Sequence, residues 1–200
     1  MSANMMDFAT NTKTDRILGA ALGCFKQYGF KRTSMEDIAK AADISRPAIY
    51  NIFKSKTDVF RSLSEQFHGK TLENAKIAFS EDMNLQRRVT SALIARMTPL
   101  YALAHDSLHG PELFDVNQST SADINAKADD TFLHMLTAAL QNGFNTHEIT
   151  SGQSDLAPRE LAQFILASAT GLKSFAFSAQ DYETLLTKSV DTTFHGLAPK

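Results

Sequence analysis

Side chains that could recognise a nucleic acid gather between residues 31 and 56. In the major groove of DNA, an arginine such as Arg46 can pair with guanine O6 and N7, and an asparagine such as Asn51 with adenine N6 and N7. Basic residues flank this pair and could hold the phosphate backbone: Lys31, Arg32, Lys54 and Lys56. In the alternative interpretation, Arg46 and Asn51 are only solvated, and Lys31 and Arg32 are an ordinary exposed pair.

Two short helices are predicted to position these side chains. The sequence Thr33-Ser34-Met35-Glu36 fits a capping box in which Thr33 caps the first helix. Ser45 is expected to cap the second helix, at about residues 46–52, and Pro47 is tolerated in its first turn. Together with a preceding helix over 13–28, this is the pattern of a helix-turn-helix, whose second helix can enter the major groove.

The rest of the chain also has helical periodicity. Apolar residues recur at helical spacing, and no useful stretch alternates with period two. The pattern predicts further helices at about 56–79, 85–105, 111–117, 121–141, 158–178 and 181–195. We therefore expect an all-α fold of about nine helices.

Composition and charge limit the class of protein. The 200 residues are 43% hydrophobic with a net charge of −2; no apolar run is long enough to span a membrane, and no secretory signal is recognised. We therefore expect a cytoplasmic protein with no membrane partner. Residues 1–60 carry nine basic and six acidic side chains, a net charge of +3. The remaining residues have a net charge of −5, which gives the total of −2. The basic excess coincides with the predicted helix-turn-helix, and residues 1–12 are expected to be a flexible tail.

Residues 13–60 carry a set of side chains in one order and spacing: Phe25, Tyr28-Gly29-Phe30, Thr33, Asp37-Ile38-Ala39, Ala42, Ser45, Ile49-Tyr50, Phe53, and Lys56 followed by Val59-Phe60. On these residues the segment resembles the N-terminal DNA-binding domain of the TetR/AcrR family of transcriptional regulators. The resemblance implies a helix-turn-helix DNA-binding domain over 13–56 and a larger helical ligand-binding and dimerisation domain over 57–200. Asp43 stands where the family has a turn glycine, and Ile52 where it often has a histidine that contacts the DNA backbone.

The resemblance also implies roles for single residues. Thr33 and Ser34 match the start of the family's second helix, where a hydroxyl or an amide meets phosphate. The other matching positions form the leading turn of the recognition helix, the specificity position that follows it and two contacts to the DNA backbone: Ser45, Arg46, Pro47, Ala48, Asn51, Tyr50 and Lys56. Tyr50 could instead be a core aromatic residue.

The larger domain offers apolar candidates for a ligand pocket. They are Met97, Tyr101, Phe114, Phe132, Met135 and Phe164, and the alternative is that each is an ordinary core residue. Small residues between 162 and 179, together with the last helix, predict a homodimer through the last two helices. His105 and His109 have a spacing that could suit a metal on a helix, but Gly110-Pro111 indicates that the helix has already ended. We expect no metal and no cofactor.

These expectations combine into one function. The chain is predicted to be a dimeric, ligand-responsive regulator of transcription, a repressor that a small, largely apolar molecule releases from a double-stranded DNA operator. A metal-responsive regulator of the same fold is the first alternative, and an all-helical enzyme the second. The enzyme is disfavoured because the sequence has no glycine-rich nucleotide loop, no HExxH and no GxSxG motif.

Overall fold

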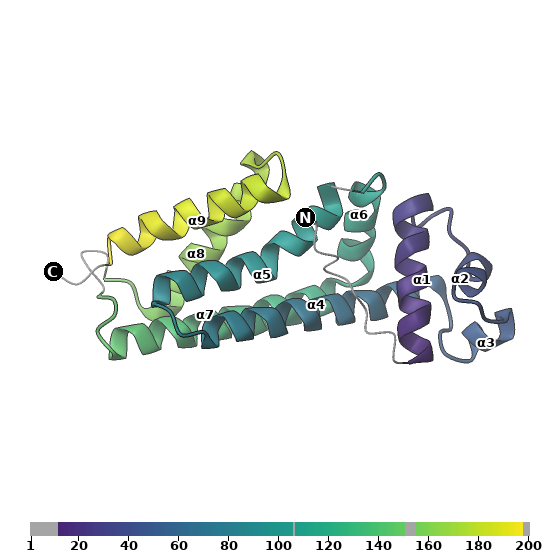
Figure 1. The fold of residues 1–200 in the computed structure, drawn as a ribbon, viewed down its shortest axis with the longest axis horizontal. Coiled ribbons are helices and arrows are strands. Elements are labelled where there is room, and N and C mark those ends of the chain that lie inside the picture. The colour runs from purple at the N-terminus through teal and green to yellow at the C-terminus, as the bar shows by residue number, and fades with distance from the viewer. Residues whose placement is uncertain (1–11, 106, 151–154, 198–200) are drawn as a thin grey trace. The chain divides into compact units, whose positions relative to one another are not determined.

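A computed structural model describes residues 12–105, 107–150 and 155–197. In these ranges the chain is all-α, as predicted, with nine α-helices, one short 3-10 helix and no strand (Figure 1). The elements are α1 (Lys13–Tyr28), α2 (Met35–Ala41), α3 (Arg46–Tyr50), α4 (Lys56–Ser80), α5 (Leu85–His105), α6 (Gly110–Thr120), α7 (Ala122–Asn145), α8 (Pro158–Leu172), η1 (Lys173–Phe175) and α9 (Ala179–His195). The predicted tail lies outside the described residues except for Thr12, which caps α1.

Two compact units divide the chain. The first contains residues up to Gly69 together with Leu103–Ala126, and the second contains Lys70–Ala102 and the residues from Lys127 onward. Helices α4, α5 and α7 therefore contribute residues to both units. The predicted boundary at 56/57 concerns function, which the packing units do not test, so it stays a prediction.

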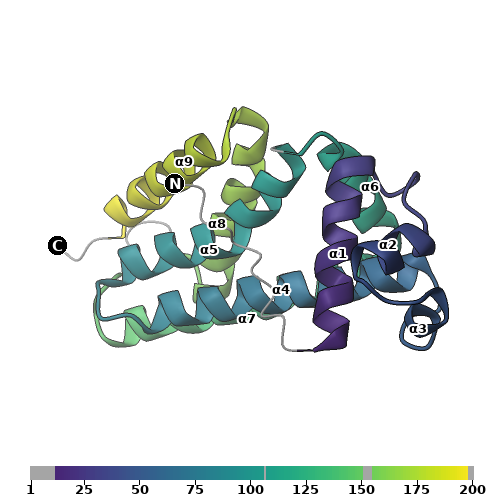
Figure 2. The ribbon, with the colours of Figure 1, turned by 45° about the vertical axis from the view of Figure 1, so that its right-hand side comes forward.

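The first unit is built around α1. Its buried face is apolar at helical spacing, with Ile17, Ala21 and Phe25 fully buried. Helices α2 and α3 lie beside α1 (Figure 1), and α6 lies near α1 as well (Figure 2). Leu113 on α6 belongs to the same buried core. This core fixes the position of the short α3, which has too few residues to be a stable helix alone.

Two stacked tyrosines mark the core of the second unit. The rings of Tyr101 on α5 and Tyr182 on α9 lie 4.8 Å apart. The Tyr101 hydroxyl donates to the Ala176 carbonyl at 2.7 Å, and the Tyr182 hydroxyl donates to the Ala169 carbonyl at 2.9 Å. Both polar ends are therefore satisfied in the interior, and burial raises the pKa of Tyr182.

Four predicted C-terminal helix ends differ from the observed ones by two residues or more. The helix expected over 111–117 continues to Thr120. The helix expected over 46–52 ends at Tyr50. The helix expected over 121–141 continues through Gly143 to Asn145. Gly143 serves close packing within the fold, because a Cβ there would collide with Leu85. The helix expected over 158–178 ends at Leu172, and the extended backbone at Ala176 presents its carbonyl to Tyr101. Across the described residues, no helix combines the length and the hydropathy that a membrane crossing requires.

Candidate nucleic-acid interface

The first short helix of the interface begins one residue later than predicted. Ser34 caps α2: its Oγ accepts the Asp37 N–H at 3.1 Å, and the Asp37 carboxylate accepts the Ser34 N–H at 2.8 Å. These hydrogen bonds lower the pKa of Asp37. The capping box predicted at Thr33 and Glu36 is therefore wrong, because the Thr33 hydroxyl faces the interior, where it donates to the Gly29 carbonyl at 2.7 Å. Ser34 is exposed and Thr33 is not.

The turn between α2 and α3 depends on Asp43. Its φ is +53°, in the left-handed region that glycine adopts most readily and that aspartate tolerates. The N–H groups of Asp43 and Ile44 donate to the carbonyls of Lys40 and Ala39, which closes the turn. The expected tight connection therefore forms without the glycine.

Most polar and aromatic side chains of helix α3 are exposed to solvent. Ser45 caps it by accepting the Ala48 N–H at 3.3 Å. Arg46, Pro47, Tyr50 and Asn51 are exposed, Ala48 is half-buried, and Ile49 anchors the helix in the core. Tyr50 is 43% exposed, so the alternative of a core aromatic residue does not hold.

Arg46 has only weak partners in the described structure. Its Nη1 lies 3.8 Å from Glu36 Oε2, with both side chains well exposed, and its guanidinium lies 5.9 Å from the centre of the Tyr50 ring. Exposed ion pairs contribute little stability. The guanidinium can therefore leave these partners at small cost.

Lys56 points into the loop that precedes α2. Its Nζ donates to the carbonyls of Phe30 at 2.5 Å and Thr33 at 2.7 Å, and it lies 4.4 Å from the centre of the Phe30 ring. Partial burial lowers its pKa. The sequence predicted a phosphate contact here, and the structure adds a bracing role that the sequence did not indicate.

Glu112 on α6 braces the same loop. Its Oε1 accepts the Lys31 N–H at 2.8 Å, and its Oε2 lies 3.6 Å from Nδ1 of His109. Gly29, at φ +82°, makes room for this carboxylate, because a Cβ at that position would collide with it. Sequence reasoning missed this contact, since the hydrogen-bonded pair is 81 residues apart and no local pattern links them.

Comparison with known proteins agrees with this geometry. Residues 17–63 match the model of the bacterial regulatory proteins of the tetR family. Over residues 17–63, which contain α2 and α3, the chain matches the TetR family. It is 49% identical over 49 residues to the HTH-type transcriptional regulator AcrR of Shigella flexneri, and 32% identical over 79 residues to the uncharacterized HTH-type transcriptional regulator YhgD of Bacillus subtilis. These matches cover 24% and 40% of this chain, and 23% and 41% of the relatives.

A solved structure of similar fold extends over nearly the whole chain. SmeT, the repressor of the Stenotrophomonas maltophilia multidrug efflux pump SmeDEF, matches 96% of this chain and 93% of its own, with a TM-score of 0.67 and 18% identity. The likeness supports the TetR fold for both units. AcrR and YhgD are named as transcriptional regulators and SmeT as a repressor, which agrees with the prediction that the chain is not an enzyme.

The candidate ligand residues of the chain do not all lie together. Tyr101 and Phe132 are buried in the core of the second unit, and Met97 and Met135 pack against that core. Phe164 is 53% exposed on α8, and Phe114 is 39% exposed and belongs to the first unit. Four of the six candidates thus share one core, and their role in ligand binding stays a prediction.

His109 already has a neighbour in the Glu112 carboxylate, and His105 ends α5. Over the residues that the structure describes, no three histidine, cysteine, aspartate or glutamate side chains are grouped so as to hold a metal.

Proposed function

We propose that this chain is a TetR-family, DNA-binding regulator of transcription that reads its operator with α3. The observation that supports this most is the exposure of Arg46 and Asn51 on a capped helix that Ile49 anchors in the core of the first unit. Arg46 at the first helical position suits pairing with guanine, and Asn51 at the end of the helix suits pairing with adenine. Tyr50 and the first turn of α3 would meet the sugar-phosphate backbone.

Ser34 is the better phosphate contact of the two residues proposed at the start of α2. Its side chain is exposed, and the hydroxyl of Thr33 is occupied inside the unit. Lys54 is exposed at the turn that follows α3, and it can supply a charge that Lys56 directs inward. Each phosphate contact made by a lysine or arginine releases counterions, so operator binding is expected to weaken steeply with salt.

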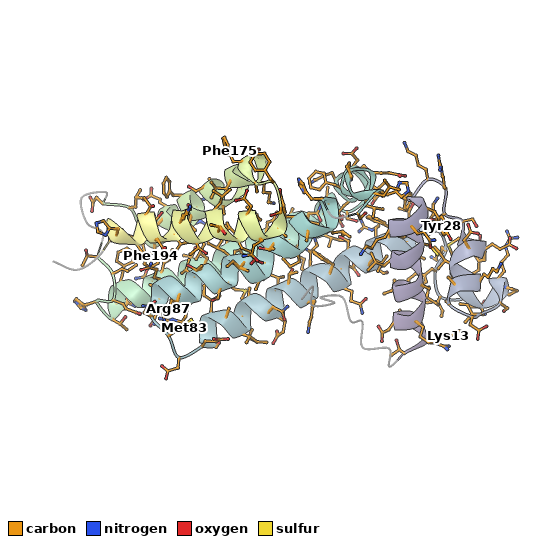
Figure 3. The ribbon with its side chains drawn as sticks, turned by 45° about the horizontal axis from the view of Figure 1, so that its top comes forward. Lys13, Tyr28, Met83, Arg87, Phe175 and Phe194 are labelled. Carbon is orange, nitrogen blue, oxygen red and sulfur yellow. The ribbon has the colours of Figure 1, made fainter. Side chains whose placement is uncertain are left out.

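The proposed regulator acts as a homodimer through α8 and α9. The exposed side of α8 carries small residues, among them Ala167, Thr170 and Gly171, which would let a second copy approach closely. Phe175 projects outward just beyond α8 (Figure 3), and it is 70% exposed. Covering such a side chain would stabilise a dimer. A two-fold dimer would place two α3 helices at half-sites about one DNA turn apart, roughly 34–36 Å.

The proposed signal is a small, largely apolar molecule that binds in the second unit and releases the repressor from DNA. SmeT has been solved in a complex with triclosan, an example of such a ligand in a protein of this fold. A ligand that binds one arrangement of the dimer more tightly than the other would shift the population away from the DNA-bound form. A cytoplasmic location follows from this role.

A gel-shift experiment tests the proposal. The full chain is titrated into the DNA upstream of its own gene and into a scrambled duplex of the same composition. Salt-sensitive binding that favours the first duplex is expected, and Arg46→Ala should lose that preference. Lys127→Ala, an exposed change on α7, is the matched control and should bind as the wild type does. Equal binding to both duplexes would contradict the proposal.

A further inference from the structure

One buried polar side chain interrupts the apolar face of α6. Leu113 and Asn117 lie one helical turn apart on that face, and they are only 4% and 7% exposed. Leu113 belongs to the apolar core of the first unit, whereas Asn117 brings an amide to the same buried face. A buried amide is costly unless it is hydrogen-bonded, so its place in the helix needs a physical reason.

The amide of Asn117 joins α6 to two other helices. Its Oδ1 accepts the hydroxyl of Ser64 on α4 at 2.9 Å, and its Nδ2 donates to Oδ1 of Asn125 on α7 at 3.1 Å. The Nδ2 of Asn125 donates in return to the backbone carbonyl of Asn117 at 3.5 Å. Each end of the Asn117 amide is therefore held by a different helix of the first unit.

These hydrogen bonds fit together in one orientation. The Nε2 of His68 on α4 lies 2.8 Å from the same Oδ1 of Asn125. Because an amide oxygen accepts and does not donate, this nitrogen of His68 carries a hydrogen. Turning the Asn125 amide over would place its NH2 group against the NH2 group of Asn117. The network is therefore directional from end to end.

Directional contacts restrict how α6 can slide along its neighbours. Apolar contacts have no direction, so a purely apolar face can move to the next apolar position at little cost. A movement of α6 by one turn, about 5.4 Å, would instead bring Leu113 to the place of Asn117 and separate the amide from its partners. Buried donors and acceptors would then be left unpaired. A single buried asparagine fixes the register of coiled-coil helices in this way.

The register of α6 decides whether its contact with the DNA-binding helices can form. Glu112 lies five residues before Asn117 on α6, and its carboxylate accepts the Lys31 N–H at 2.8 Å in the loop before α2. A displacement of one turn is larger than the range of a hydrogen bond. The Glu112 contact therefore forms in only one register of α6.

We propose that Asn117 is a positioning residue that sets the register of α6 through Ser64 and Asn125, and that it thereby places Glu112 against the loop before α2. The effect on operator binding rests on the proposed function. The effect on the position of α6 concerns the first unit alone and can be measured without DNA.

Distances between two nitroxide labels measure the register. Cys24→Ala removes the single native cysteine, and Lys40→Cys on α2 and Gln118→Cys on α6 give two exposed labelling sites in the first unit. Labelled chain is mixed with an excess of unlabelled chain, so that label pairs within one chain dominate. Pulsed electron paramagnetic resonance should then show one narrow distance distribution.

The variant Ser64→Ala/Asn117→Leu removes the amide together with its donor on α4. Asn125 keeps His68 at its Oδ1 and the backbone carbonyl of residue 117 at its Nδ2, so the change leaves no member of the network unpaired. The face of α6 then carries apolar side chains at both turns. We expect the distance distribution to broaden or to gain a second maximum, with shifts of up to about one turn. A folded variant with the wild-type distribution would overturn the proposal.

Two further variants complete the test. Ser80→Ala/Asn142→Leu makes the same two substitutions at exposed positions and should leave the distribution unchanged, and broadening there as well would overturn the proposal. Asn117→Leu alone should broaden the distribution, because the Ser64 hydroxyl can turn to the carbonyl one turn earlier on its own helix. Thermal melts establish that each variant is folded. Failure of both Asn117 variants to fold would assign this residue to folding rather than to register, and would overturn the proposal too.

Operator titration of the unlabelled chains connects the register to function. If only the native register binds, the dissociation constant of Ser64→Ala/Asn117→Leu should rise by the reciprocal of the fraction that keeps this register, about twofold when half of the chains leave it. The preference over a scrambled duplex should remain, because α3 is untouched. An unchanged dissociation constant beside broadened distances would overturn the role of the Glu112 contact.

The two measurements also separate this inference from the function on which its second half rests. If the distances respond as expected but the wild-type chain binds no DNA, the register stands and the regulator does not. If the wild-type chain binds its operator and the distances do not respond, the regulator stands and the register does not.

Discussion

Gly29→Ala tests in depth how α6 is joined to the DNA-binding helices. Gly29 has φ +82° and ψ +162°, a region of backbone conformation that is essentially restricted to glycine. Holding an alanine there costs about 1–3 kcal/mol. The added Cβ would also collide with the Glu112 carboxylate and lie 3.1 Å from His109 Nδ1.

The collision adds a second cost. Moving the carboxylate away breaks its hydrogen bond with the Lys31 N–H, and a hydrogen bond to a charged group is worth about 1.5–3 kcal/mol. Glu112 is partly exposed, so we take a value at or just below the lower end of this range, about 1–1.5 kcal/mol. The free energy of unfolding should therefore fall by roughly 2–4 kcal/mol in total.

Urea unfolding of a double-mutant cycle separates the two costs. In a Glu112→Ala background the collision is gone, so Gly29→Ala should lose only its backbone strain, and the two changes should couple by about 1 kcal/mol. Gly23→Ala on α1 is the matched control: its Cβ would meet nothing within 4 Å, and it should stabilise the helix by about 0.5–1 kcal/mol. Additive costs of Gly29→Ala and Glu112→Ala would refute the contact between the loop and α6.

Three further changes probe the first unit. Arg46→Ala should weaken operator binding by about 1–3 kcal/mol and relax the preference at one base pair, with thermal stability almost unchanged; a uniform loss on all sequences would mean a phosphate contact instead. Lys56→Met should lower the free energy of unfolding, measured with urea, by roughly 1.5–3 kcal/mol, because the loop carbonyls lose their charged donor. Unaltered stability would mean that Lys56 does not brace the loop and acts only in contacting DNA. Asp123, whose pKa is lowered to about 2 mainly by hydrogen bonds from Arg61, stabilises the folded state above its unfolded pKa. That stability is lost as the pH falls toward 2, so Asp123→Asn should flatten the acid limb of a pH–stability curve, and an unchanged limb would argue against the pair.

Local signals were enough to predict much of the first unit. The bounds of α1 follow from its apolar stripe and from Gly29. Ser45 is identified as the N-cap of α3 because its hydroxyl side chain comes just before a first turn that contains Pro47. At the start of α2 the local signal is ambiguous, since Thr33 and Ser34 each have an acid three residues later. Burial of Thr33 against α1 decides between them, and burial is a tertiary property.

Other features depend on contacts that are distant in the sequence. Gly143 indicates a helix end by its type, yet it allows close contact with Leu85, 58 residues earlier. Arg96 could have been found: it occupies the apolar stripe of the helix with Leu85, Val89 and Leu93, where a charge needs an explanation. Its partners on α4 and α7 could not, because only the fold brings those helices together.

Selection from a pool of random DNA duplexes with the full wild-type chain measures the central claim most directly. We predict that one motif is enriched, with two inverted half-sites about one helical turn apart, and that Arg46→Ala changes the preferred base at the same position in both halves. Enrichment of no motif, or an identical motif for Arg46→Ala, would contradict the claim that α3 reads DNA.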